Sequence, residues 1–305
     1  MISAKPVDVP LVAQKRRRKS LSGIEPYLWV LPALAFYFVF KIVPLLSGLY
    51  LAMLRWNGID PPVFVFFDNF LRILEDEVFY LALWYNVHYA AGTVIGKTVL
   101  ALGLALLLNN ELSGRVYYRT GLFLPVVMSF VVVAILWTWI YDIRVGMINS
   151  LLRLLGLTSL TQDWLGDTKI AMWSLIAVDI WKWYGFHMVI FLAGLQTIPL
   201  ELYEGAMMDG ASRWNQFWSI TLPMLRPVML VNVTLSLMGA FNVFEIPFLM
   251  TEGGPAGSTQ VMALLVYIRG FKFYNFGYAS ALSFVMFIVV MCVASIQMKL
   301  MGDRD

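Results

Sequence analysis

The chain has 305 residues, of which 60% are hydrophobic and 13% are charged, and its net charge is +3. Soluble domains carry about 25% charged residues, so this composition excludes an ordinary soluble globular protein. A single cysteine, Cys292, excludes an internal disulfide. The basic run Lys15–Lys19 directly precedes the first apolar segment, which indicates a membrane-topology signal rather than a nucleic-acid-binding surface.

Six long apolar stretches predict membrane-spanning helices, because about 20 apolar residues cross the hydrocarbon core and backbone groups in lipid must be bonded within their own segment. The predicted spans are Tyr27–Leu51, Leu83–Leu108, Tyr118–Tyr141, Ile170–Leu195, Pro227–Met250 and Tyr278–Leu300. The first is too long for a cleaved signal peptide and is interpreted as a retained helix. Prolines in or beside the first, third and fifth spans predict kinks there. The predicted fold is an all-α polytopic membrane protein.

The distribution of lysine and arginine predicts the orientation of these spans. Segments placed inside with the N-terminus carry more of these residues than segments placed outside, chiefly because of Lys15–Lys19. Both termini are therefore expected in the cytoplasm, since the number of spans is even. The expected organisation is a basic tail over residues 1–26 and a six-helix membrane domain over residues 27–305, with an inner loop over residues 196–226.

This inner loop is much more polar than its surroundings. Pro199 is well placed to open a short helix, and Gly210 is well placed to end it. A second short segment with Trp214, Phe217 and Trp218 follows, which predicts a helix–turn–helix on the cytoplasmic face. Periodicity alone is more typical of an amphipathic helix that merely lies on lipid headgroups than of a docking element.

The motif within the loop is more specific. The pattern Glu204-x-Ala206-x-x-Asp209-Gly210-Ala211, followed by Ile220-Thr221-Leu222-Pro223, resembles the EAA loop of permease subunits in binding-protein-dependent ABC importers. It is most similar to the carbohydrate group, which includes the maltose and glycerol-3-phosphate permeases. Four further stretches agree with that family, namely Leu192–Pro199, Gly146–Asn149, Thr251–Pro255 and Phe276–Ala281. The sequence departs from the family at Gly205, where alanine is usual.

The resemblance implies a division of labour among subunits. Two permease subunits, here a non-identical pair, form the pathway, a cytoplasmic ABC ATPase dimer binds ATP and Mg²⁺, and an external solute-binding protein delivers solute. The residues implied to contact the ATPase are Glu204, Ala206, Asp209, Gly210, Ala211, Leu222 and Pro223. Among them, Glu204 would pair with a basic residue of the ATPase, and Gly210 would allow the sharp turn. The chain itself is then no enzyme and binds no cofactor or metal, and it resides in the inner membrane of a prokaryote.

One motif is interpreted as a chance match. Residues Ala91–Thr98 approach the sequence of a phosphate-binding loop, but that loop requires a preceding strand and a helix N-terminus. Here the stretch lies inside a predicted span, so Lys97 is interpreted as a pathway or inter-helix charge. The histidines, His88 and His187, lie on different spans and are each expected to hydrogen-bond another helix.

Five charged residues fall within predicted spans, and each would cost roughly 2.5–3.5 kcal/mol at the bilayer centre if exposed to lipid. They are Lys41, Lys97, Asp179, Lys182 and Glu245. Asp179 and Lys182 are three residues apart, so they are predicted to form an ion pair, with a pathway role as the alternative. Asn242 and Glu245 share a predicted helix face next to Phe241 and Phe244. This chemistry suits sugar hydroxyls and equally suits a helix–helix contact.

The leading hypothesis is the membrane-pathway subunit of an ABC importer of sugars or sugar-like solutes. The alternative is a self-sufficient secondary transporter driven by ions through Asp179 or Glu245, although such transporters often show internal repeats. An integral-membrane enzyme would require a clustered reactive constellation, which the sequence lacks. The sequence does not name the solute.

Overall fold

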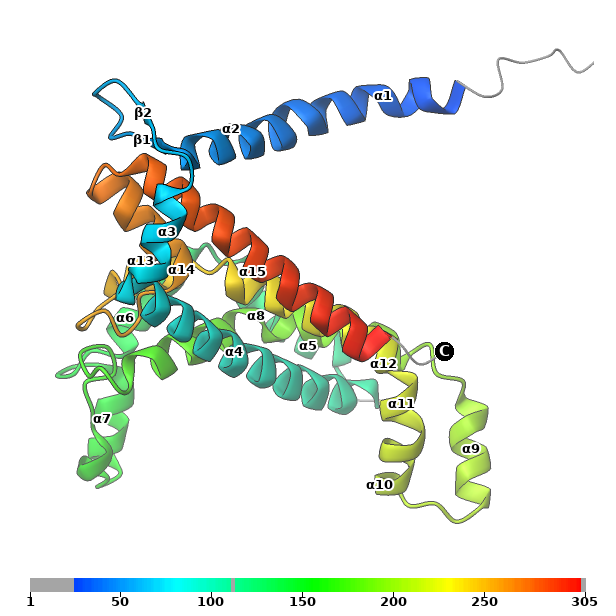
Figure 1. Ribbon diagram of the computed structural model, residues 1–305. Helices are drawn as coiled ribbons and strands as arrows, with labels where there is room; N and C mark the ends of the chain where they lie inside the picture. Colours follow the sequence, from blue (N-terminus) through cyan, green and yellow to red (C-terminus); the bar gives the residue numbers. More distant parts are fainter. Residues whose placement is uncertain (1–24, 111–112, 303–305) are drawn as a thin grey trace, which may run out of the picture. The chain divides into compact units, whose positions relative to one another are not determined.

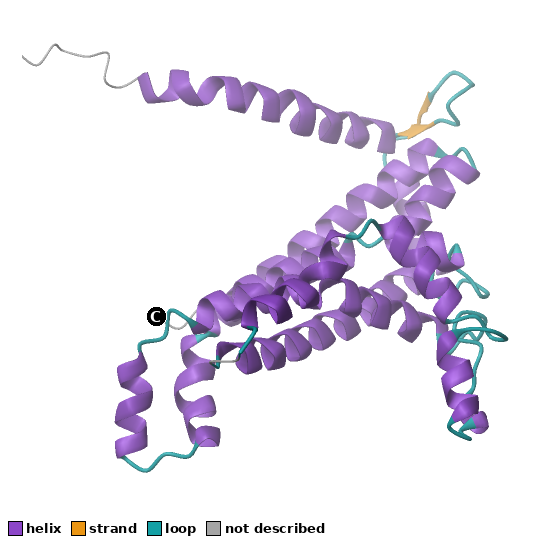
Figure 2. Ribbon diagram, turned by 180° about the vertical axis from the view of Figure 1, so that it is seen from behind, coloured by secondary structure: helices purple, strands orange, loops and turns teal. Residues whose placement is uncertain are grey.

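The computed structural model describes residues 25–110 and 113–302, so the basic run Lys15–Lys19 lies outside the described residues, as does most of the tail predicted over residues 1–26. The chain divides into two compact units, residues 1–48 and 49–305. Its described part is helical except for turns and one small hairpin, in which β1 (Leu54–Arg55) pairs antiparallel with β2 (Val63–Phe64) (Figure 2).

The first unit contributes most of one apolar helix. It contains α1 (Glu25–Tyr37), the π turn η1 (Phe38–Ile42) and the start of α2 (Val43–Ala52), and Tyr27–Ala52 is long and apolar enough to cross a membrane. The π turn lies just before Pro44, which lacks an N–H group and whose ring would clash with the carbonyl four residues earlier in a regular helix.

Three further helices of the second unit are long and apolar enough to span a membrane. These are α4 (Glu77–Asn109), α8 (Ala171–Leu195) and α15 (Phe276–Gly302). Two bent helix pairs could each form one more span, which raises the number among the described residues from four to as many as six. The prediction of an all-α polytopic membrane protein is confirmed.

The third predicted span is not one continuous helix. Its two halves are α5 (Arg115–Val127) and α6 (Phe130–Ile140), which meet at an angle of 98°. Pro125 lies in the last turn of α5, and Ser129 begins α6 by accepting a hydrogen bond from the Val132 N–H at 3.3 Å. The prolines predicted a kink, whereas the structure has a complete break.

The fifth predicted span, Pro227–Met250, is likewise broken and not merely kinked. Helix α12 (Arg226–Phe241) ends before a non-helical stretch at residues 242–244, and α13 (Glu245–Thr251) follows. Pro247 accounts for this break, because it cannot donate to the carbonyl of Val243 and its ring would clash with that carbonyl in a continuous helix. A second bend of 67° joins α12 to the short helices that precede it.

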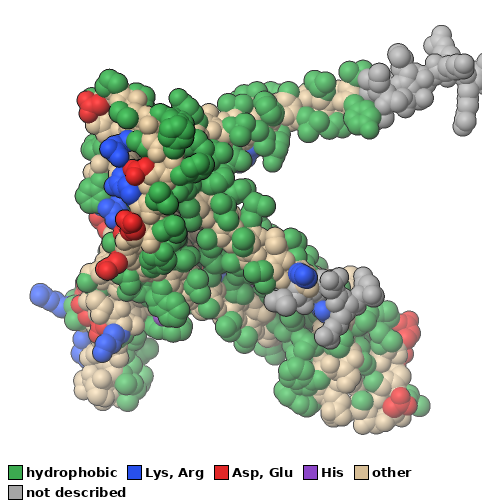
Figure 3. All heavy atoms as spheres, viewed as in Figure 1, with side chains coloured by type: hydrophobic (Ala, Val, Ile, Leu, Met, Phe, Trp, Pro, Cys, Tyr) green, Lys and Arg blue, Asp and Glu red, His purple; other side chains and the backbone are tan. Residues whose placement is uncertain are grey.

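The segments predicted as outer loops contain structure of their own. They hold α3 (Asp68–Glu75), α7 (Met147–Leu154), the 3₁₀ turn η2 (Thr158–Leu160), α14 (Met262–Tyr267) and the π turn η4 (Ile268–Lys272). Figure 1 shows α3, α7, α13 and α14 towards one end of the second unit and α9 to α11 at the other. In the view of Figure 3, hydrophobic side chains cover α4 and α15, while charged side chains gather towards the ends. This distribution is typical of helices whose middle sections face lipid.

Helices α4 and α8 form the centre of the second unit, and close approach between helices depends on glycines. A Cβ atom added at Gly96 of α4 would lie 2.2 Å from Ile180 Cδ1 of α8. On the other side of α8, a Cβ atom at Gly185 would lie 2.3 Å from the carbonyl oxygen of Leu122 in α5. Small residues allow backbones to approach closely in membrane proteins, where packing supplies much of the association energy.

We expect Gly185→Ala to destabilise the protein by about 1–3 kcal/mol, the usual cost of overpacking a close contact. The backbone carbonyl of Leu122 cannot move aside as a flexible side chain could. Gly103→Ala is the matched control, because it is also helical and nothing lies within 4 Å of its added Cβ. Thermal unfolding of the purified protein in detergent measures both changes, and equal melting temperatures for the two variants would contradict the packing argument.

Candidate functional site

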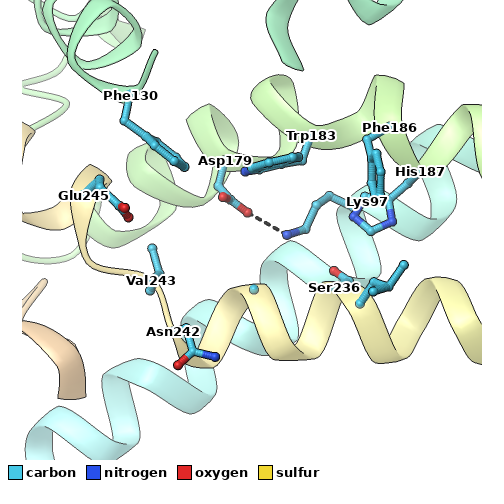
Figure 4. A pocket seen from close by; sticks show the side chains of 12 residues that line it. Lys97, Phe130, Asp179, Trp183, Phe186, His187, Ser236, Asn242, Val243 and Glu245 are labelled. Carbon is cyan, nitrogen blue, oxygen red and sulfur yellow. Dashed lines mark hydrogen bonds and ion pairs between the residues drawn. The ribbon is translucent and has the colours of Figure 1, made fainter. Parts of the chain in front are cut away.

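The second unit contains a cavity of about 390 Å³ among its helices (Figure 4). The cavity is lined from α4, α6, α8, α12 and the start of α13 by a mixture of aromatic, charged and amide side chains and small residues. They are Lys97, Phe130, Asp179, Trp183, Phe186, His187, Leu235, Ser236, Gly239, Asn242, Val243 and Glu245. Pockets for small ligands typically measure 300–1,000 Å³ and combine apolar walls with a few polar groups. This cavity is of that type.

A buried ion pair joins two helices that line the cavity. Lys97 Nζ of α4 lies 2.8 Å from Asp179 Oδ2 of α8, and the two side chains are only 3% and 7% exposed (Figure 4). The prediction that Asp179 pairs with Lys182 is therefore wrong, whereas the interpretation of Lys97 as an inter-helix charge is confirmed. Removing one member of a buried pair leaves an uncompensated charge, so this contact constrains how α4 and α8 pack.

Lys182 has different partners because the broken third span ends beside it. Its ammonium donates to the backbone carbonyl oxygens of Met128 at 2.6 Å and of Pro125 and Val126 at 3.4 Å. Lys182 is buried and does not line the cavity. The periodicity of α8 correctly places Asp179 and Lys182 one turn apart, but only the tertiary structure brings Lys97 to one and open carbonyls to the other.

Asn242 and Glu245 both line the cavity, although not for the predicted reason. They do not share the face of a continuous helix, because the break at residues 242–244 separates α12 from α13. Asn242 Nδ2 donates to the carbonyl oxygen of Met238 at 2.8 Å, and Asn242 and Glu245 are both exposed. The break therefore directs an amide and a carboxylate towards the same space.

The two phenylalanines predicted beside them do not belong to the cavity lining. Phe241 is buried in the core, and Phe244 stacks on Phe248 with ring centroids 5.0 Å apart. The aromatic rings at the cavity are instead Phe130, Trp183 and Phe186. Sequence spacing could not identify Phe130, because it comes from a different span and reaches the cavity only through the bend between α5 and α6.

The remaining polar residues of the spans connect helices. The His187 Nδ1 atom contacts Asn232 Oδ1, and Asn232 Nδ2 donates to the His187 carbonyl oxygen at 3.0 Å, which links α8 to α12. His88 instead packs against the Trp173 ring. Asn86 Nδ2 donates to the carbonyl oxygen of Ala240 at 3.3 Å. Within residues 25–110 and 113–302, no group of three or more histidines, cysteines and carboxylates could hold a metal ion.

The stretch Ala91–Thr98 lies in the middle of α4, which runs without interruption from Glu77 to Asn109. Its backbone N–H groups therefore lie within a regular helix, whose N–H groups bond to preceding carbonyls. A phosphate-binding loop instead needs backbone N–H groups that face the ligand at a helix N-terminus. This geometry agrees with the interpretation of the sequence match as accidental.

The polar inner loop has a sharply defined turn. Helix α9 (Leu200–Met208) is followed by Gly210, whose φ of +78° lies in the left-handed region that favours glycine. The Gly210 N–H donates to the Met207 carbonyl at 3.0 Å, and the Ala211 N–H donates to the Ala206 carbonyl at 2.8 Å. This pair of bonds is a Schellman motif, which ends the helix and satisfies its last carbonyls.

The second arm of the loop returns towards α12 through α10 (Arg213–Gln216), the π turn η3 (Phe217–Thr221) and α11 (Leu222–Met224). The hydroxyl groups of Tyr203 and Thr221 lie 2.9 Å apart and join the two arms. Figure 1 shows the arms side by side, with the turn between α9 and α10 at their tip. Of the residues that the motif picks out, Glu204, Asp209, Gly210 and Pro223 are exposed and Ala206, Ala211 and Leu222 are half-buried.

Comparisons with known proteins agree with this architecture. Residues 97–304 match the sequence profile of the family described as binding-protein-dependent transport system inner membrane component. The chain is 37% identical to the probable ABC transporter permease protein YurN of Bacillus subtilis, over 90% of this chain and 95% of the relative. It is 34% identical to the trehalose/maltose transport system permease protein MalF of Thermococcus litoralis, over 96% of this chain and 98% of the relative.

A solved structure shares the fold. The chain superposes with a TM-score of 0.80 on a subunit from the crystal structure of a bacterial ABC transporter involved in the import of the acidic polysaccharide alginate. The match covers 93% of this chain and 99% of that subunit, at 24% sequence identity. A second structure of a bacterial alginate ABC transporter, in complex with a periplasmic protein bound to an alginate pentasaccharide, matches with a TM-score of 0.78 at 24% identity, over 92% of this chain and 96% of that chain.

We expect Asp179→Asn and Lys97→Met each to destabilise the protein by about 3–5 kcal/mol, because either change leaves one buried charge unpaired. The double variant Lys97→Met with Asp179→Asn, which combines the same two substitutions, should lose much less stability than the sum of the two single losses, because it leaves no buried charge unpaired. The matched control is the exposed pair Arg55–Asp68, whose single alanine variants should lose about 0.2–1 kcal/mol. Thermal unfolding in detergent tests this, and strictly additive losses in the Lys97–Asp179 double variant would show that the two charges do not interact.

Proposed function

The chain belongs to the family of binding-protein-dependent transport system inner membrane components, and we propose that it forms one half of the membrane pathway of an ATP-driven importer of sugars or sugar-like polar solutes. The observation that carries this proposal is the mixed lining of the cavity. Aromatic rings, an amide, a carboxylate and an ion pair meet there beside the middle of α8, while a polar helix–turn–helix follows the C-terminal end of α8.

The cavity suits a neutral polyhydroxylated solute. Phe130, Trp183 and Phe186 offer flat apolar surfaces for the C–H faces of a sugar ring, and Asn242 and Glu245 offer hydrogen-bond partners for hydroxyl groups. The relative from Thermococcus litoralis is named for trehalose and maltose transport, which is the same chemical class. The exposed residues Asn242 and Glu245 of the cavity lining would face the second permease subunit, which would complete the wall.

The inner loop suits a mechanical contact with an ATPase. It exposes Glu204 in the middle of α9 and Asp209 and Gly210 at the turn, and the Tyr203–Thr221 contact couples the two arms. In this proposal a separate cytoplasmic ATPase dimer binds ATP and Mg²⁺, pairs a basic residue with Glu204 and moves the loop as a unit. An external solute-binding protein delivers solute to the opposite end. The protein then resides in the inner membrane of a prokaryote, with both termini in the cytoplasm.

We predict that the complete transporter, reconstituted in proteoliposomes with its partner subunits and binding protein, takes up sugar only when ATP is supplied. Gly210→Val should leave the protein inserted and the ATPase active but reduce uptake more than about tenfold, because a β-branched residue is strained at positive φ and distorts the turn. Gly156→Val is the matched control, since Gly156 has a φ of +76° in the outer segment and equally open surroundings.

Two results would contradict this proposal. Uptake driven by an ion gradient in liposomes that contain this chain alone would indicate a secondary transporter, for which Glu245 would be the remaining carboxylate of the cavity, because Asp179 is paired with Lys97. Normal ATP-driven uptake by Gly210→Val, with Gly156→Val as a reference, would count against a docking role for the loop.

We predict that Glu245→Ala raises the KM for uptake by about tenfold while the complex still assembles, because a hydrogen-bonding partner of the solute is lost. The control is Glu75→Ala, which removes an exposed carboxylate of α3 that lies outside the cavity. Uptake assays over a range of sugar concentrations, together with size-exclusion chromatography of the complex, separate the outcomes. Unchanged KM with impaired assembly would make Glu245 a structural residue.

A further inference from the structure

Lys182 is a buried cation whose hydrogen-bond partners are all backbone carbonyls. The side chain is 2% exposed, and the neighbouring carboxylate of Asp179 is paired with Lys97. Its ammonium donates to the carbonyls of Pro125, Val126 and Met128. A buried charge needs compensation, and here carbonyl dipoles supply it.

These three carbonyls lie at the C-terminal end of α5, which Met128 directly follows, and the Pro125 carbonyl also accepts a hydrogen bond from the Met128 N–H at 3.3 Å. Helix α5 ends at Val127, and the last carbonyls of a helix lack intrahelical donors. At membrane depth no water is available to replace those donors. An ammonium group has three N–H donors and is attracted to the negative end of the helix dipole, so Lys182 acts as the cap of α5 at its 98° junction with α6.

The packing of α8 against α5 keeps this cap in place. Gly185 lies one turn beyond Lys182 on α8, and the backbone of α5 at Leu122 comes so close that only a glycine fits. The same stretch of α8 therefore provides both the surface at Gly185 on which the last turns of α5 pack and the Lys182 ammonium that binds the C-terminal carbonyls of α5.

The other side of the ammonium group faces two aromatic rings of the cavity. Lys182 Nζ lies 4.7 Å from the ring centroid of Phe130 and 5.2 Å from that of Trp183. Both distances are within the range of cation–π attraction. Phe130 is the first residue of α6, so the cation contacts the end of α5 and the start of α6 together, and both rings line the cavity.

We propose that Lys182 is a positioning residue for the solute pathway. It caps the end of α5 in the broken third span and thereby holds the Phe130 ring at the wall of the cavity. The inference rests on the proposed function only for its transport measurements. Lys182 does not line the cavity, so it shapes solute binding through Phe130 rather than by contact.

A double-mutant cycle tests this proposal in the complete reconstituted transporter. Lys182→Met should raise the KM for uptake by about tenfold, and Lys182→Arg, which keeps the cation and its donors, should restore most of the affinity. Phe130→Ala should raise KM similarly, and the double variant should be no worse than Phe130→Ala alone. Ser174→Ala is the control, because it removes a buried hydrogen bond of α8 to the Trp164 carbonyl, outside the cavity.

A distance measurement tests the same proposal without transport. Spin labels at Val116→Cys on α5 and Trp139→Cys on α6, both exposed positions, report the bend between the helices in a Cys292→Ser background. Lys182→Met should broaden the distance distribution, and Lys182→Arg should restore it. If Lys182→Met fails to assemble, Lys182→Gln replaces it in both experiments.

Additive effects of the Lys182 and Phe130 variants on KM would overturn the proposal, and so would an unchanged distance distribution in Lys182→Met. A KM that rises equally in Lys182→Arg and Lys182→Met, with Phe130→Ala unaffected, would show that the ammonium itself binds solute and would also overturn it. If the wild-type complex shows no ATP-driven uptake, the proposed function fails, and the spin-label distances alone decide whether Lys182 positions the bend.

Discussion

The architecture depends on one constraint: polar groups at membrane depth must find partners within the protein, because lipid supplies none. The Lys97–Asp179 pair, the Asn232–His187 contacts and the Asn86 contact with Ala240 each join two different helices. Each would be costly to break, since an unpaired buried polar group loses water without gaining a partner. These contacts therefore specify which helices are neighbours, whereas apolar side chains, which suit lipid equally well, cannot.

The same constraint explains where the protein can break its helices. A break exposes backbone carbonyls and N–H groups, so it survives only where the surrounding protein satisfies them or where it lines a cavity. The break between α5 and α6 is capped by Lys182, and the break between α12 and α13 opens onto the cavity at Asn242 and Val243. Irregular backbone at these breaks directs side chains that a continuous helix would point elsewhere, and it brings Phe130, Asn242 and Glu245 to the cavity.

The cavity and the inner loop differ in what stabilises them. The cavity is lined by long-range contacts between residues far apart in the sequence, such as Lys97 and Asp179. The loop is organised mainly by local bonds, above all the Schellman turn at Gly210 and the cap at Ser212. A locally determined element of this kind keeps its shape while its surroundings move. In the proposed function, that property suits a part that receives force from the ATPase, whereas the cavity would change shape to bind and release solute.

The sequence by itself determined the membrane class, most of the positions of the spans, and the helix–turn–helix with its turn at Gly210, because hydropathy, proline and glycine act over short distances along the chain. It also picked out Asp179, Asn242 and Glu245 as unusual, since charges and amides in apolar stretches demand an explanation. Only the tertiary structure decided the partners. It paired Asp179 with Lys97, placed the ammonium of Lys182 against carbonyls at the end of α5 and at Met128, and brought Phe130 to the cavity in place of Phe241 and Phe244. The physical reason is that pairing depends on how helices distant in sequence rotate and bend against one another, which no local pattern records.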